Sequence, residues 1–308
     1  MKIKTRIFCL SIILSLILGM DIPWQATAQS GETRVFLPIL HDRFDTGPGD
    51  IKGEVIDAVS GSHVVGATVC FENNCVQTDE NGVYKLTGIP AGGQYFRASA
   101  ATYYSIGRWA DVIAYKESQL NLVMSQILSI SQVTMRIITT WSSNQFWPPA
   151  NYENDLDAFL WVTTSGIAPQ LVWDATPDVS IAQCTSYPNA CKENDAREGT
   201  GPETIAVQIL TPGSTYYFGV LNYNQYQPDV PPIRETQAAI GVYNEQGLMT
   251  TFSIPNKGDG NFWYVFSMDD SGVIHPQNCI IELSPSEGTL PDCNVQPAQK
   301  MQKMPRKP

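Results

Sequence analysis

Apolar and polar residues alternate along most of the chain after residue 50, which is the pattern of half-buried β-strands. The clearest case is a pair of alternating runs on either side of one turn. The apolar positions of these two runs are Ile205, Val207, Ile209, Tyr216, Phe218 and Val220. The turn at residues 211–214 contains a proline, which presets φ, and a glycine, which tolerates positive φ. The pattern predicts a hairpin of these two strands, with the other strands of residues 130–285 packed around it.

The same patterning predicts an all-β protein with two β-sandwich domains in tandem. Short strands separated by turns occupy residues 51–125, and the Asn-Gly pair of the turn at residues 79–82 favours a hairpin because it supplies positive φ. A second set of strands occupies residues 130–285, and neither set carries a long apolar stripe at helical spacing. Strands of this length and spacing are typical of sandwiches. The 308 residues are enough for two such domains.

The first 28 residues have the composition of a secretory signal peptide. Basic residues precede an apolar run at residues 7–20, and Ala28 ends a sequence that fits the small-residue cleavage rule. We expect export, cleavage after Ala28 and a mature chain without a transmembrane anchor, with an uncleaved anchor as the alternative. Residues 29–50 would be a lead-in and linker, and residues 286–308 a largely disordered tail.

Charge narrows the classes of partner. The formal net charge is −11, and 16% of the residues are charged, compared with ~25% in an average globular protein. A nucleic-acid partner is disfavoured, because neutralising phosphates requires a basic surface. The acidity has two interpretations, solubility and cation binding.

Six cysteines remain after removal of the signal peptide, and an even number in an exported chain predicts disulfides. Their spacing predicts three local pairs: Cys70 with Cys75, Cys184 with Cys191, and Cys279 with Cys293. If residues 72 and 73 form a two-residue hairpin loop, the first pair faces across non-hydrogen-bonded positions ~4.5 Å apart. Zinc binding is the alternative, but no CxxC spacing occurs and the chain has only three histidines.

Residues 51–124 resemble the carboxypeptidase regulatory-like domain, a transthyretin-like β-sandwich. The resemblance rests on four segments, at residues 53–55, 65–69, 78–84 and 88–92. These segments contain turn and packing residues, so they bear on fold and not on chemistry. The family occurs as a non-catalytic accessory module beside other exported domains, which implies a stabilising or spacing role.

Residues 130–285 resemble the YfaP-like family of exported bacterial β-sandwich domains. The matching segments, in the order expected for that family, are residues 135–141, 155–157, 201–204 and 263–266. A histidine expected shortly after the Asp-Leu-Asp segment is absent, since Ala158-Phe159-Leu160-Trp161 follows. The resemblance implies architecture and an exported location and brings no assigned activity.

A carboxylate-rich segment is the candidate metal site. Asp155 and Asp157 flank Leu156, so in a strand both carboxylates leave one face while Leu156 enters the core. With Glu203 nearby, they could bind calcium, which prefers carboxylate and carbonyl oxygens. Further ligands could come from a loop that contains Asp174, Asp178, Glu193 and Asp195. The alternative is structural: Asp155 caps a loop and Asp157 pairs with Arg136 or Arg197.

Aromatic residues near loops offer a candidate ligand surface. The residues of this group are Trp109, Trp141, Phe146, Trp147, Tyr152, Tyr223 and Tyr226. Trp147, Tyr223 and Tyr226 lie in polar surroundings and could stack on sugars, as exposed aromatic residues do in carbohydrate-binding modules. Packing at the core and its rim is the alternative.

Catalytic signatures are missing from the sequence. It contains no GxSxG, HExxH or phosphate-binding glycine loop, and its three histidines are dispersed. We therefore expect an exported, non-enzymatic binding or structural module of a bacterial envelope or secreted surface, with a surface protein or glycan as partner. The alternatives are a calcium-dependent carbohydrate-binding module and an accessory subunit of a secreted peptidase or glycosidase.

Overall fold

The computed structural model describes residues 47–128, 133–141, 155–173, 184, 188–196, 201–226 and 230–294. Within these ranges the chain is all-β, as predicted, and its one helical turn is the 3₁₀ turn η2 (Ile233–Glu235). No helix of the described chain is long and apolar enough to cross a membrane. The predicted signal peptide, most of the lead-in and the tail after residue 294 lie outside the described residues.

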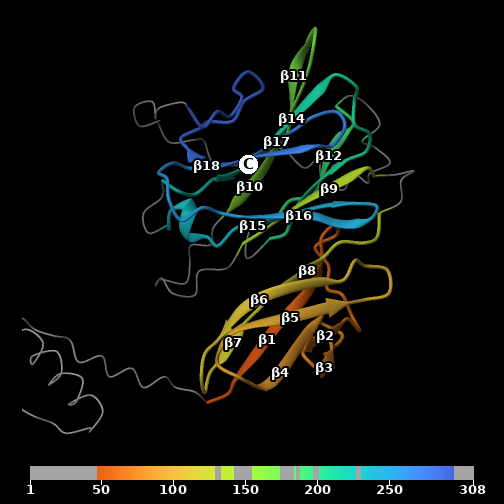
Figure 1. The fold of residues 1–308 in the computed structure, drawn as a ribbon, viewed down its shortest axis with the longest axis vertical. Helices are drawn as coiled ribbons and strands as arrows, with labels where there is room; N and C mark the ends of the chain where they lie inside the picture. The colour runs from red at the N-terminus through yellow and green to blue at the C-terminus, as the bar shows by residue number, and fades with distance from the viewer. Residues whose placement is uncertain are drawn as a thin grey trace, which may run out of the picture. The chain divides into compact units, whose positions relative to one another are not determined.

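The first sandwich, drawn in orange to yellow in Figure 1, contains eight strands in two sheets. One sheet has the order β4-β1-β7, with β8 also paired to β1, and the other has the order β3-β2-β5-β6. The strands are β1 (Gly49–Asp57), β2 (Thr68–Phe71), β3 (Asn74–Gln77), β4 (Val83–Ile89), β5 (Gly92–Ser99), β6 (Ile106–Val112), β7 (Glu117–Gln119) and β8 (Leu122–Met124). Between the sheets, Ile51, Leu86 and Phe96 belong to one buried apolar cluster.

Local turn chemistry is confirmed in this sandwich. Cys70 pairs with Cys75 in the register of β2 and β3, and their disulfide joins Cα atoms 4.1 Å apart. The turn before β4 closes with the N–H of Gly82 donating to Asp79 O, 3.0 Å away. A glycine is required at position 82, because φ is +69° and a Cβ there would lie 2.7 Å from His63.

Two strands of the first sandwich, β6 and β7, were not predicted from the pattern. β6 pairs along its whole length with β5, and β7 runs parallel to β1. Trp109, which the sequence placed near a loop, therefore lies in the middle of a strand. The last strand, β8, pairs with β1 in parallel.

The second sandwich consists of two five-stranded sheets, β11-β10-β14-β17-β18 and β12-β13-β9-β15-β16. The strands, coloured yellow-green to blue in Figure 1, are β9 (Met135–Thr140), β10 (Leu156–Thr164), β11 (Ile167–Val172), β12 (Ala190–Asn194), β13 (Glu203–Val207), β14 (Ser214–Asn222), β15 (Ala239–Asn244), β16 (Gly247–Ser253), β17 (Phe262–Met268) and β18 (Ile274–Ile281). Its main apolar cluster contains residues from both sheets, among them Leu160, Phe218 and Val242.

The predicted hairpin of the second domain is wrong. β13 pairs with β12 and β9, whereas β14 pairs with β10 and β17, so the two runs lie in different sheets. The predicted turn does exist, with the N–H of Ser214 donating to Thr211 O. Ile209 lies beyond β13 and is exposed. Residues 208–213 carry the chain from one sheet to the other. The alternation of apolar residues identifies strands but does not tell which strands pair.

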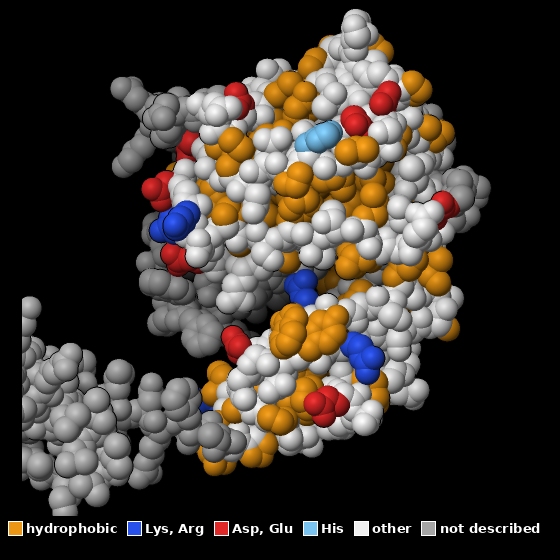
Figure 2. All heavy atoms as spheres, in the orientation of Figure 1, with side chains coloured by type: hydrophobic (Ala, Val, Ile, Leu, Met, Phe, Trp, Pro, Cys, Tyr) orange, Lys and Arg blue, Asp and Glu red, His pale blue; other side chains and the backbone are white. Residues whose placement is uncertain are grey.

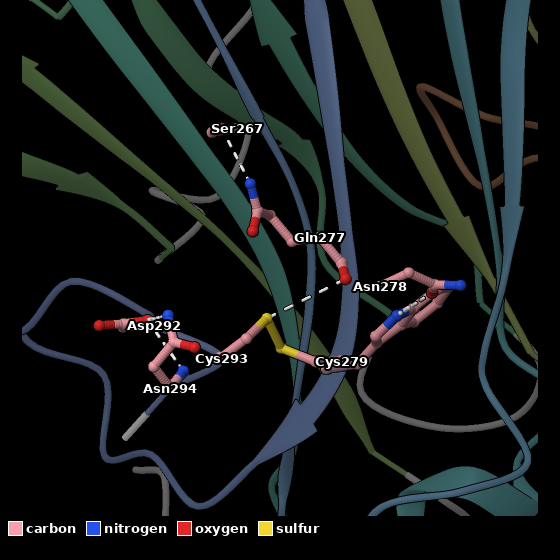
Figure 3. Close-up of a disulfide and its surroundings, with 8 residues drawn as sticks. Ser267, Gln277, Asn278, Cys279, Asp292, Cys293 and Asn294 are labelled. Atoms are coloured by element: carbon pink, nitrogen blue, oxygen red, sulfur yellow. Dashed lines mark hydrogen bonds between the residues drawn. A yellow bond between two sulfur atoms is a disulfide. The ribbon is translucent and has the colours of Figure 1, made fainter.

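The outer face of β10 is covered by the C-terminal segment. Phe159 and Trp161 form a second buried cluster with Leu283 and Cys293, and the indole N–H of Trp161 donates to Ser286 O at 2.8 Å. Figure 3 shows the disulfide between Cys279 on β18 and Cys293, which holds this segment against the sheet. The first part of the predicted tail is therefore ordered by packing.

All three predicted cysteine pairs are present as disulfides, the other being Cys184–Cys191. Three disulfides are typical of proteins that mature in an oxidising compartment.

Residues 45–308 form one compact unit that includes both sandwiches. The hydroxyl of Tyr104 donates to Asn244 O at 2.9 Å, and Arg108 donates to the hydroxyl of Thr140 at 3.0 Å. Independent folding of residues 51–125 stays a prediction.

Replacing Thr78 should destabilise the first sandwich. Its buried hydroxyl donates to Val64 O at 2.6 Å and accepts from the N–H of Ala67 at 2.9 Å. Thr78→Val leaves both backbone groups without this partner, so we expect a loss of about 1–3 kcal/mol in urea unfolding. Thr87→Val, on the exposed side of β4, is the control and should change stability by less than about 0.5 kcal/mol. Equal effects of the two variants would contradict the assignment.

Candidate functional site

A buried lysine surrounded by carboxylates is the most polar cluster inside the second sandwich. Lys192 Nζ lies 2.6 Å from Asp195 Oδ1, 2.9 Å from Glu203 Oε1 and 3.8 Å from Asp157 Oδ1. The side chains of Lys192 and Glu203 are fully buried, and that of Asp157 is nearly so. Lys192 and Glu203 come from β12 and β13, while Asp157 comes from β10 in the opposite sheet. The cluster therefore connects the two sheets.

An open strand edge explains why polar groups gather here. β11 pairs with β10 only from Leu160 onward, so residues 156–159 have β14 on one side and no further strand among the described residues. In this part of β10 the N–H of Ala158 donates to Glu203 Oε2. Lys192 Nζ donates to the carbonyl of Trp173, 3.2 Å away and just beyond β11. Side chains of one sheet thus complete the hydrogen bonding of the other.

Burial and charge determine where the protons lie. Burial raises the pKa of Glu203 well above its ordinary value, and the charge of Asp157 adds to the rise, while Lys192 opposes it. Burial lowers the pKa of Lys192, but the charges of Glu203, Asp157 and Asp195 outweigh it, so the net shift of that pKa is upward. One ammonium faces three carboxylates here, and Glu203, the fully buried one, is the member whose pKa burial raises.

The predicted calcium ligands are only partly brought together. Asp157 and Glu203 belong to one group with Asp195, whose carboxylate oxygens lie within 4.8 Å of one another, and Asp155 is not a member of that group. Lys192 contacts all three carboxylates of the group, so this donor set does not fit a divalent ion while the ammonium is present. Asp174 and Asp178 lie outside the described residues.

Among the described residues Asp157 has Lys192 as its cationic neighbour, which neither interpretation of this segment named. Arg136 does not pair with Asp157; it forms a two-pronged ion pair with Glu193, at 2.6 and 3.0 Å. Arg197 lies outside the described residues. Lys192 was not predicted as a site residue. No alternation of apolar residues in the segment Ala190–Asn194 marks this lysine as buried.

The predicted aromatic ligand residues are not brought together as a surface. Trp147 lies outside the described residues. Tyr223 is half-buried and packs beside the cluster under the C-terminal segment, while Tyr226 is exposed and its hydroxyl contacts Glu282. Their use in ligand binding stays a prediction.

Two aromatic side chains lie next to each other on the solvent-exposed face of the first sandwich. Tyr95 and Trp109 face each other across β5 and β6, with ring centroids 5.3 Å apart and planes inclined by 52°. Trp109 is 71% exposed and Tyr95 is 44% exposed. We call these two residues the aromatic platform. Figure 2 shows that exposed hydrophobic side chains on one face of the molecule are interspersed with charged ones.

The residues around the aromatic platform keep it open. A Cβ at Gly107 would lie 1.8 Å from the Tyr95 hydroxyl, so the tyrosine ring lies directly over this glycine and would have to move for any larger residue. Alternation places Arg97 and Asp111 on the same outer face, and both are exposed. Arg97 reaches Glu72 O, at 3.5 Å. The platform is thus an apolar surface flanked by one positively charged residue, Arg97, and one negatively charged residue, Asp111.

Comparison with known proteins gives similarity of structure only. No known protein family matches the chain, and no curated protein matches it. A solved protein of unknown function is 16% identical, covering 50% of this chain and 93% of its own, with a TM-score of 0.38. A homologue of telluride resistance protein TerD from Streptomyces coelicolor A3(2) is 12% identical, covering 52% and 99%, with a TM-score of 0.36. A type II cohesin–X-dockerin complex from Acetivibrio cellulolyticus is 18% identical, covering 25% and 58%, with a TM-score of 0.22.

Removing the charge of Glu203 should change the pH dependence of stability. A carboxyl whose pKa is raised on folding binds its proton more tightly in the folded state, so its contribution to stability falls as pH rises above the ordinary value of 4.5. We expect the stability of the wild type relative to Glu203→Gln to decrease from about pH 4 to pH 8 in urea unfolding. Glu80→Gln, in an exposed turn, is the control. A difference that rises with pH would contradict the shift.

Proposed function

We propose that this protein is an exported, non-enzymatic binding module whose first sandwich holds a neutral polysaccharide on the aromatic platform. The observation that carries the proposal is the exposure of Trp109 beside Tyr95 in the middle of a regular sheet. Forming a strand does not require a solvent-exposed tryptophan at position 109. Large exposed aromatic groups are typical of binding surfaces. The three disulfides support maturation outside the cytoplasm.

The chemistry of the platform favours a sugar chain. The C–H faces of pyranose rings are apolar and stack on aromatic faces, while their hydroxyls need donors and acceptors at the rim. Arg97 supplies donors and Asp111 supplies acceptors on the same face. The net charge of −11 disfavours a polyanionic glycan. The neutral class is therefore the one we assign.

The family resemblances enter the same proposal. We propose a carboxypeptidase regulatory-like domain followed by a YfaP-like domain, preceded by a signal peptide that is cleaved after Ala28. The two-sandwich architecture supports this. A surface protein as partner, or service as an accessory subunit of a secreted enzyme, would also use an exposed platform of this kind.

Loss of the indole should weaken polysaccharide retention. In affinity electrophoresis of the mature chain through gels that contain neutral polysaccharides, Trp109→Ala should weaken retention at least about tenfold, the equivalent of 1.4 kcal/mol. Tyr95→Ala should weaken it in part. Tyr115→Ala is the matched control, because Tyr115 is 72% exposed but lies in the connection between β6 and β7. Retention that survives in Trp109→Ala, or fails equally in the control, would refute the platform.

Chelation distinguishes this proposal from a calcium-dependent module. Since the Lys192 side chain lies against Asp157 and Glu203, where an ion would have to bind, we expect neither the melting temperature nor polysaccharide retention to change between chelator and ~10⁻³ M calcium, the range of extracellular sites. A melting temperature that calcium raises in the wild type but not in Asp157→Asn would instead establish the predicted calcium site.

A further inference from the structure

Lys192 has the surroundings of a reacting group as well as those of an ion-pair partner. Its amine is sealed from solvent in contact with carboxylates of two sheets, and no other lysine of the described chain is buried. We propose that Lys192 and Asp157 condense within the folded protein to an amide that covalently joins the two sheets, with Glu203 as the residue that relays the proton. This proposal concerns the second sandwich and is independent of the aromatic platform.

The positions of the three carboxylates assign them different roles. Asp195 lies three residues from Lys192 and holds the amine at 2.6 Å, so it is the local anchor. Glu203 is bound at one oxygen by the N–H of Ala158 and faces the amine with the other, 2.9 Å away. Asp157 Oδ1 is 3.8 Å from Nζ and belongs to the opposite sheet. Oδ1 is bonded to Cγ, the atom that the amine would attack, so the carboxyl group of Asp157 lies beside the amine from across the two sheets.

The reaction balances without any co-reactant. The ammonium of Lys192 passes one proton to the carboxylate of Asp157, and the free amine then forms a bond from Nζ to Cγ of the resulting carboxylic acid. Glu203 carries a proton from the nitrogen to the leaving oxygen, the C–O bond breaks, and one water molecule departs. An ammonium and a carboxylate thus become a neutral amide and water, with no change of oxidation state, and Glu203 ends in the protonation state in which it began.

Burial favours the amide over the ion pair. In water both ions are well hydrated, but a buried ion loses most of that hydration. The amide removes one positive and one negative charge from the cluster. Groups held in contact by a fold react with effective concentrations of about 10⁵–10⁸ M, so the condensation does not depend on a chance encounter. Burial of Glu203, which raises its pKa, keeps a proton available for the relay.

Mass spectrometry of the wild-type chain tests the proposal directly. The chain, expressed from Gln29 and purified in its folded form, is reduced and alkylated at its six cysteines. We expect its intact mass to be lower than the mass of the sequence by one water molecule. Trypsin should leave the bond after Lys192 intact, and tandem spectra should show a branched peptide linking Lys192 to Asp157. A full-mass wild type that is cleaved after Lys192 overturns the proposal.

Variants separate the roles of the three residues. Lys192→Arg keeps a cation but lacks the amine, so it should retain the full mass. Asp157→Asn should lose one ammonia in place of one water, because the side-chain amide then supplies the leaving group. Glu203→Gln should lose water at least about tenfold more slowly, since general acid–base catalysis contributes 10²–10⁴-fold. A link from Lys192 to Asp195 in the tandem spectra, or full-rate water loss in Glu203→Gln, would overturn the assignment.

Discussion

The second sandwich depends on how it closes the edge of β10 at residues 156–159. β14 pairs with one side of this segment, and β11 begins to pair only at Leu160. A buried N–H without an acceptor would be costly here, and the carboxylate of Glu203 accepts from Ala158. That carboxylate is itself buried, so it needs Lys192, and the lysine in turn lies against Asp157 and Asp195. One backbone group thus accounts for a whole charged cluster inside the protein.

Much of the local structure could be predicted from the sequence, because turns and strand alternation are local properties. The turn that ends at Gly82, the facing of Cys70 and Cys75, and the all-β class follow from residue types a few positions apart. The pairing of β13 with β9 and of β14 with β10 does not, since each strand is buried on both faces and could pair with several others.

The candidate sites were harder to predict for the same reason. Asp157 and Glu203 were expected to come together, and they do, but the sequence suggested a metal ion as the positive charge between them. Lys192 supplies that charge from β12, the strand that precedes β13 and pairs with it. The aromatic platform was missed because β6 was not predicted, and without β6 the facing of Trp109 and Tyr95 cannot be inferred.

None of the three disulfides links the two sheets of the second sandwich to each other. The paired cysteines are only 5, 7 and 14 residues apart, so each bridge fastens a local segment and none spans the two sheets. Cross-links restrict the unfolded chain more strongly when they close longer loops. A bond between Lys192 and Asp157 closes a longer loop than any of the three disulfides and acts where strand pairing ends. The disulfides thus fasten the hairpin, the loop and the C-terminal segment, whereas the proposed amide would add a covalent link between the two sheets, which are otherwise held by their shared apolar core.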